Sequence, residues 1–222
     1  MAYLGKAYTQ FFKDLSKNNH RDWFQANKKT YDNEVKKPFE ALVQDLIDRM
    51  SKYDKAVTIT PKEALFRINK DVRFAKDKSP YKLHMGAIIG KDGRKGMDKP
   101  GLYFEIGATE IGVAGGLHTP DKDQLQAIRE AIAKNPIAFE KLIEEKNFIK
   151  VCGELQGESN KIVPKEFKEV FERHPVIARK QFYYFKKYDD EKLVSSDDLA
   201  AFIYNHFEAG LPLHEYLVKV LR

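Results

Sequence analysis

The stretch Tyr81-Lys-Leu-His-Met-Gly-Ala-Ile-Ile89 decides the fold class of this chain. Its apolar residues at 81, 83, 85, 87 and 89 alternate with Lys82, His84 and Gly86, and a period of two predicts a β-strand with one buried face. Ala64–Ile68 before it, and 102–106 and 111–115 after it, have similar though weaker patterns. We therefore expect an antiparallel meander of about four strands.

Helical patterns flank this central region on both sides. Apolar residues at 39, 42, 43, 46, 47 and 50 follow helical spacing, and Pro38 suits the first turn of that helix. A Thr-Pro-Asp helix start follows the sheet at Thr119, and two helices are expected at the end of the chain, separated by Gly210 and Pro212. The aromatic segment 181–188 favours a further strand. These patterns predict an α+β fold, with the meander flanked by N- and C-terminal helices in a single domain over residues 1–222.

Composition sets bounds on the function. The chain has 222 residues, 42% of them hydrophobic, which is enough for a buried core. Its 39 Lys+Arg and 33 Asp+Glu residues give a net charge of +6, which permits binding to phosphates without requiring it. Cys152 is the only cysteine, and no apolar run is long enough to cross a bilayer, so we expect a cytoplasmic protein with no membrane partner.

A dense charge cluster lies immediately before the deciding strand. Arg67-Ile-Asn-Lys-Asp-Val-Arg-Phe-Ala-Lys-Asp-Lys-Ser-Pro-Tyr81 forms a connection between two expected strands, with Phe74 and Tyr81 as its apolar anchors. A loop of this length in a compact domain is often functional. Arginine forks, lysine point charges and a tyrosine hydroxyl together suit a phosphate or a carboxylate. The candidate ligand-binding residues are Arg67, Lys70, Arg73, Lys78, Tyr81 and Lys82.

The same residues also allow a structural interpretation. Asp71 and Asp77 could each bind a cation, and the loop would then be a salt-bridge brace without a ligand. Both interpretations can hold together, with the aspartates orienting the cations that meet the ligand. In a third interpretation, Asp71 or Asp77 acts as the general base of a metal-independent enzyme on a phosphate or carboxylate substrate. We expect no cofactor and no metal, because no histidine or carboxylate pair has ligand spacing. The expected partners are a phosphorylated small molecule or a nucleic-acid backbone.

The charged stretch also resembles a known family. The pattern R-x-x-R-D-x-R-F, a short spacer and D/N-K-x-x-Y is typical of a family of unknown function found in bacteria and fungi, and here it has Lys70 where the family usually has arginine. Other segments of the chain are similar to further patterns of this family, namely Asn18-Asn19, Trp23-Phe24, Gly116–Pro120 and 211–213. The resemblance covers essentially the whole chain. It implies no activity, cofactor or partner.

Overall fold

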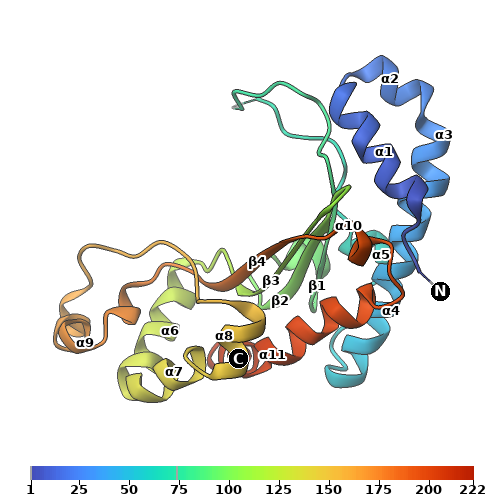
Figure 1. The fold of residues 1–222 in the computed structure, drawn as a ribbon. Helices are drawn as coiled ribbons and strands as arrows, with labels where there is room; N and C mark the ends of the chain where they lie inside the picture. The colour runs from blue at the N-terminus through green and yellow to red at the C-terminus, as the bar shows by residue number, and fades with distance from the viewer. Residues whose placement is uncertain (1, 74) are drawn as a thin grey trace. The chain divides into compact units, whose positions relative to one another are not determined.

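A computed structural model describes residues 2–73 and 75–222. Its four strands are β1 (Met85–Ile89), β2 (Gly101–Ile106), β3 (Glu110–Leu117) and β4 (Phe182–Asp189). They form one antiparallel sheet in the order β1-β2-β3-β4, with helices before and after it in the chain (Figure 1). The predicted α+β class and the antiparallel sheet are confirmed.

The described chain divides into two compact units. Unit 1 contains Met1–Lys95, Tyr103–Val113 and Lys187–Tyr204, and unit 2 contains Gly96–Leu102, Ala114–Lys186 and Asn205–Arg222. The single domain over residues 1–222 stays a prediction.

Unit 1 is built mainly from the first helices and the charged loop. Helix α4 (Lys37–Tyr53) buries the predicted apolar face, and its Phe39 ring lies 5.6 Å from the Phe104 ring of the sheet, measured between ring centroids. The Tyr8 hydroxyl donates a hydrogen bond of 2.7 Å to the Ile106 carbonyl. The helices are α1 (Lys6–Lys17), α2 (Arg21–Ala26), α3 (Lys28–Thr30), the π-helix η1 (Tyr31–Lys36), α4 (Lys37–Tyr53), α5 (Pro61–Ala64) and α10 (Glu191–Val194), and the 3-10 helix η2 (Gly93–Gly96) ends at the unit boundary.

Unit 2 packs its helices around a core that includes Phe139, Phe148, Phe182 and Tyr184. Asp121 caps α6 rather than Thr119, because its carboxylate accepts the backbone N–H of Gln124 at 2.8 Å. The elements are α6 (Lys122–Lys134), α7 (Pro136–Ile143), α8 (Lys146–Cys152), η3 (Lys165–Phe167), α9 (Lys168–Arg173) and η4 (Pro175–Ala178), and α11 (Leu199–Val220) begins in unit 1 and ends here.

The prediction of a strand at Ala64–Ile68 was wrong. Thr60 and Glu63 form a capping box that starts the short helix α5, so Ala64 is helical. The residues that follow form only isolated bridges, Leu65 with Ala87 and Asn69 with Tyr81. The expected strand from Tyr81 accordingly begins only at Met85. The aromatic segment, in contrast, does form a strand, which is β4.

The break expected at Gly210 was also wrong, because α11 continues through Gly210 and Pro212 to Val220. Gly210 is needed for close packing instead. A Cβ built there would lie 2.6 Å from a ring carbon of Tyr184, and one on Gly115 would lie 2.4 Å from the Tyr184 hydroxyl. That hydroxyl donates a 2.8 Å hydrogen bond to the His206 carbonyl, which fixes the ring between the two glycines.

Gly210→Ala should destabilise the protein. Alanine favours a helix over glycine by about 1 kcal/mol, but overpacking against the fixed ring costs about 1–3 kcal/mol, so the steric cost exceeds the gain. Urea denaturation measures the difference. In a Tyr184→Leu background the same substitution should cost less, and stabilisation in the unmodified background would contradict this account of the packing.

Candidate functional site: the charged loop and the adjoining sheet face

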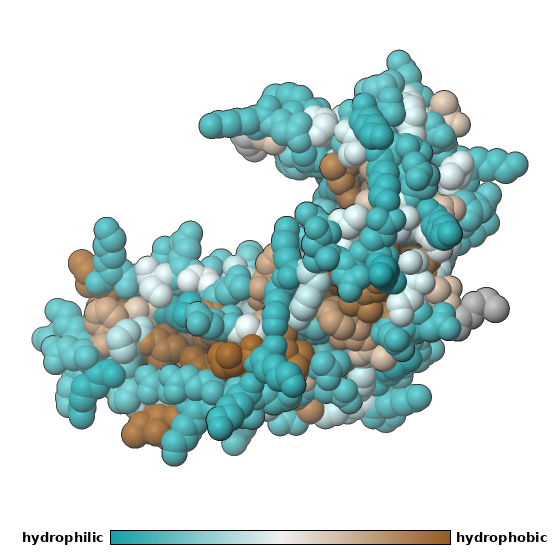
Figure 2. Space-filling model, viewed as in Figure 1, coloured by the Kyte–Doolittle hydropathy of each residue, from teal (hydrophilic) through white to brown (hydrophobic). Residues whose placement is uncertain are grey.

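The charged segment forms a long loop whose base is closed by backbone hydrogen bonds (Figure 1). The Lys70 N–H donates to the Pro80 carbonyl, and the Lys82 N–H donates to the Ile68 carbonyl, each at 2.8 Å. Hydrophilic side chains cover the loop (Figure 2). Phe74, the expected apolar anchor, lies outside the described residues.

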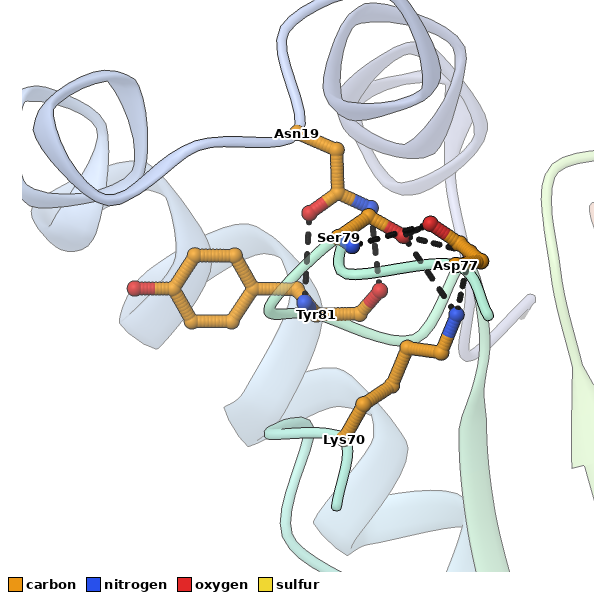
Figure 3. Close-up of polar contacts among 5 residues, drawn as sticks. All are labelled: Asn19, Lys70, Asp77, Ser79 and Tyr81. Carbon is orange, nitrogen blue, oxygen red and sulfur yellow. Dashed lines mark hydrogen bonds and ion pairs between the residues drawn. The ribbon is translucent and has the colours of Figure 1, made fainter. Parts of the chain in front are cut away.

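Asn19 holds the base of the loop to the N-terminal helices. Its side-chain amide donates to the Tyr81 carbonyl at 2.9 Å and accepts the Tyr81 N–H at 3.1 Å (Figure 3). The N-cap of α2 is His20, whose ring nitrogen accepts the Trp23 N–H, so Asn19 serves the loop and not the helix.

Tyr81 is a core residue and does not lie among the loop cations. Its side chain is 5% exposed, and its ring stacks on Phe24 with centroids 4.0 Å apart. The ring points away from Lys70 and Asp77 (Figure 3). Of its two predicted roles, this geometry supports anchoring, because the ring packs on Phe24 and its hydroxyl points away from Lys70.

Asp77 organises the second half of the loop. Its carboxylate accepts hydrogen bonds from Lys70 Nζ at 2.6 Å, from the Ser79 N–H at 2.9 Å and from Ser79 Oγ (Figure 3). These donors hold the pKa of the Asp77 carboxyl well below its usual range, with the Lys70 bond as the largest cause.

Asp71 has a similar role in the first half of the loop. It accepts Arg73 Nε at 3.0 Å and a terminal guanidinium nitrogen at 2.6 Å, and the fork lowers the Asp71 pKa. A carboxylate with a lowered pKa is a weaker base, so neither aspartate has the electrostatic environment that favours a general base. The catalytic hypothesis for Asp71 and Asp77 stays a prediction.

The remaining cations are not matched by the loop's own acids. Residues 67–82 contain six Lys and Arg and two Asp, and the two ion pairs use Lys70 and Arg73. Within the described residues, Arg67, Lys76, Lys78 and Lys82 have no carboxylate partner. Lys78 Nζ instead donates to the Val72 carbonyl at 3.0 Å.

Lys82 is the half-buried member of this set. Its Nζ lies 5.4 Å from the centroid of the Phe66 ring, which is a cation–π contact. Burial lowers the pKa of the Lys82 ammonium, and repulsion from the exposed Arg67 guanidinium lowers it further, against the opposing effect of Glu105. Two cations therefore lie near one another at the base of the loop.

A polar cluster on the adjoining face of the sheet was missed by the sequence reasoning. Glu105 Oε2 accepts the Tyr103 hydroxyl at 2.6 Å and lies 3.5 Å from His84 Nε2, while Glu105 Oε1 lies 3.8 Å from Lys187 Nζ. The carboxylate is 19% exposed. Burial, and then the hydrogen bond to Glu105, raise the Tyr103 pKa well above its usual range.

One signal in the sequence could have found this cluster. Alternation in β2 places Leu102, Phe104 and Ile106 on the buried face, and so it places Tyr103 and Glu105 together on the opposite one. The contact of His84 with Glu105 has no such local signal, because Glu105 lies on β2 and is distant from His84 in the chain.

Metal and membrane features are absent from the described part of the chain. No group of three or more His, Cys, Asp or Glu side chains there could hold a metal ion. Among those same residues, none of the helices combines the length and the apolar character that crossing a bilayer requires. Cys152 is buried, and burial raises the pKa of its thiol to about 12, which disfavours the reactive thiolate.

The chain belongs to a family of conserved hypothetical proteins, DUF2461, whose sequence profile matches residues 7–216. The predicted family membership is confirmed, and the family description assigns no activity. No curated protein matches the sequence significantly.

Asn19→Ala should destabilise the protein by about 1–3 kcal/mol, because it removes both hydrogen bonds to the Tyr81 backbone and leaves a partly buried N–H unpaired. Denaturant unfolding checks this value. Asn33→Ala is the control, since the Asn33 side chain is exposed and only accepts the Lys37 ammonium. Equal stability of the two variants would contradict the clamp.

Arg73→Ala should leave the melting temperature unchanged. The Arg73 and Asp71 side chains are 76% and 47% exposed, and solvent-exposed ion pairs stabilise proteins little. Differential scanning fluorimetry tests this expectation. A decrease as large as that of Asn19→Ala would favour the alternative in which this pair braces the loop.

Proposed function

We propose that this protein binds phosphate-bearing anions through its cationic segment 67–82, with a nucleic-acid backbone as the preferred ligand. One observation supports the proposal above others. Four cations of this segment have no carboxylate partner among the described residues, although two aspartates lie within the same segment.

The distribution of these cations favours an extended ligand. Lys76 and Lys78 are exposed near the tip of the loop, whereas Arg67 and Lys82 lie at its base. A polymer with regularly spaced phosphates can contact several of these groups at once, and it releases counterions as it binds. The net charge of +6 acts in the same direction over longer distances.

The two aspartates give the loop a defined shape and still leave the segment 67–82 with a net positive charge. Asp77 with Ser79 and Lys70, and Asp71 with Arg73, hold the backbone turns of the loop. Preorganisation of this kind reduces the entropy lost when a ligand binds. A cytoplasmic location is part of the same proposal and rests on the cysteine count of the sequence.

A phosphorylated small molecule is the alternative ligand of the same chemistry. It would use Arg67 and Lys82 at the base of the loop and would not need Lys76 or Lys78. Competition by inorganic phosphate distinguishes these two ligands. A compact anion should readily displace a small phosphorylated molecule, but it should displace a polymer bound at several points only weakly.

The test measures binding of a short fluorescein-labelled DNA duplex by anisotropy over a range of salt concentrations. Affinity should fall steeply with salt, with a slope of about −0.9 in log K against log salt for each phosphate contact. A Lys76→Gln/Lys78→Gln double variant should therefore have a slope that is shallower by about 1.8.

Lys52→Gln/Lys55→Gln is the matched control, because both lysines are exposed in unit 1 at the end of α4 and beyond. It changes the net charge equally and should retain the unmodified slope to within a few tenths. A flat salt dependence, or equal losses in the two double variants, would remove the nucleic-acid proposal.

A further inference from the structure

The positive charge of Lys82 and Arg67, at the base of the loop, requires a separate explanation. Lys82 is half-buried above the Phe66 ring, and its neighbour Arg67 has the same charge. Burying a cation next to another cation is unfavourable unless an anion offsets it. Within the described residues, neither group has a carboxylate at ion-pair distance.

His84 lies close enough to Lys82 to be affected by its charge. It is 32% exposed, and its Nε2 lies 3.5 Å from Glu105 Oε2. Charged groups reach it from every adjoining element: Lys82 from its own segment, Glu105 from β2, Glu110 from β3 and Lys187 from β4. Burial and the two lysines favour neutral imidazole, and the two glutamates favour imidazolium.

The Glu105 carboxylate attracts both His84 and Lys82, but its two oxygens are shared with other groups. Its Oε2 accepts the short hydrogen bond from Tyr103, and its Oε1 faces Lys187 at 3.8 Å. Gly86 leaves space for the Tyr103 hydroxyl, because a Cβ at position 86 would lie 3.3 Å from it. Among the described residues, Lys82 and Arg67 therefore have no ion-pair partner, and the attraction of Glu105 offsets less than the repulsion that Lys82 receives from Arg67.

We propose that Lys82, Arg67 and His84 form a binding site for a small oxyanion, and that His84 takes up a proton from solvent when the anion binds. The anion offsets the repulsion between Lys82 and Arg67. The same negative charge opposes the effects of burial and of the two lysines, which lower the pKa of His84, so a proton from water completes the third contact. Glu105 stabilises the imidazolium that results. The site shares Arg67 and Lys82 with the nucleic-acid proposal but needs neither Lys76 nor Lys78, so either proposal can fail alone.

The direction of the pH dependence follows from these charges. Burial, the largest cause, lowers the pKa of His84 in the free protein, so imidazole is neutral there at neutral pH. An anion at Lys82 should raise that pKa. By linkage, the anion must bind more tightly as the pH falls through the range in which His84 titrates.

The experiment follows the imidazole signals of the full-length chain by NMR in sodium sulfate and in sodium chloride at equal ionic strength. Sulfate is the probe because it stays fully ionised over roughly pH 5 to 8, where histidine titrates. A His84→Gln variant assigns the signal among the six histidines. The His84 pKa should be higher in sulfate by about one, which corresponds to about tenfold tighter sulfate binding at the acid end.

Lys82→Gln should abolish the difference between sulfate and chloride, whereas Lys82→Arg should retain most of it. Lys52→Gln controls for the lost charge, and Lys76→Gln/Lys78→Gln controls for sulfate bound on the loop; both should retain the full difference. If Lys82→Gln does not fold, Arg67→Gln replaces it, because that side chain is exposed.

Three results would overturn the proposal. The His84 pKa could be the same in both salts, the Lys82→Gln variant could respond as the unmodified protein does, or the loop double variant could abolish the response. The last result would place the sulfate on the loop and leave the sheet face without an anion site.

Discussion

The rest of unit 1 depends on the two hydrogen bonds between the Asn19 side chain and the Tyr81 backbone. They join the turn between α1 and α2 to the point where the charged loop ends. The stack of Tyr81 on Phe24 buries the same residue against the aromatic cluster of the first helices. Because Tyr81 is fixed in this way, the charged segment before it is closed at its base, and Lys82 and His84 after it are directed toward the sheet.

Electrostatics then divides the charged segment into two parts. In the loop, each aspartate pairs with one cation, so these two pairs are formed within the loop itself. At its base, Arg67 and Lys82 have no acidic partner among the described residues, and burial of Lys82 makes that imbalance costly. The brace hypothesis therefore concerns Asp71, Asp77 and their partners, whereas the proposed anion site concerns Arg67 and Lys82.

The sheet face adds groups that a loop cannot offer. Glu105 and Tyr103 lie on β2 and His84 immediately precedes β1, so the contact of Glu105 with His84 is set by strand register and not by sequence distance. Such an arrangement holds polar side chains more rigidly than an exposed loop does, because the ladder of backbone hydrogen bonds fixes each Cβ. In the proposed anion site, this geometry would couple proton uptake at His84 to the charge at Lys82.

The sequence by itself determined the α+β class, the apolar face of α4, the antiparallel sheet and the location of the charged loop, since these follow from local periodicity and charge density. Local signals were also missed: the Thr60 and Glu63 capping box starts α5, which includes the first residue of the strand predicted at Ala64–Ile68. Only the tertiary structure decided that α11 continues through Gly210, where the Tyr184 ring occupies the missing side chain's space. It also decided which cations are paired and that Glu105 meets His84, because those contacts join residues that are distant in the chain, and their distances depend on packing that no local pattern records.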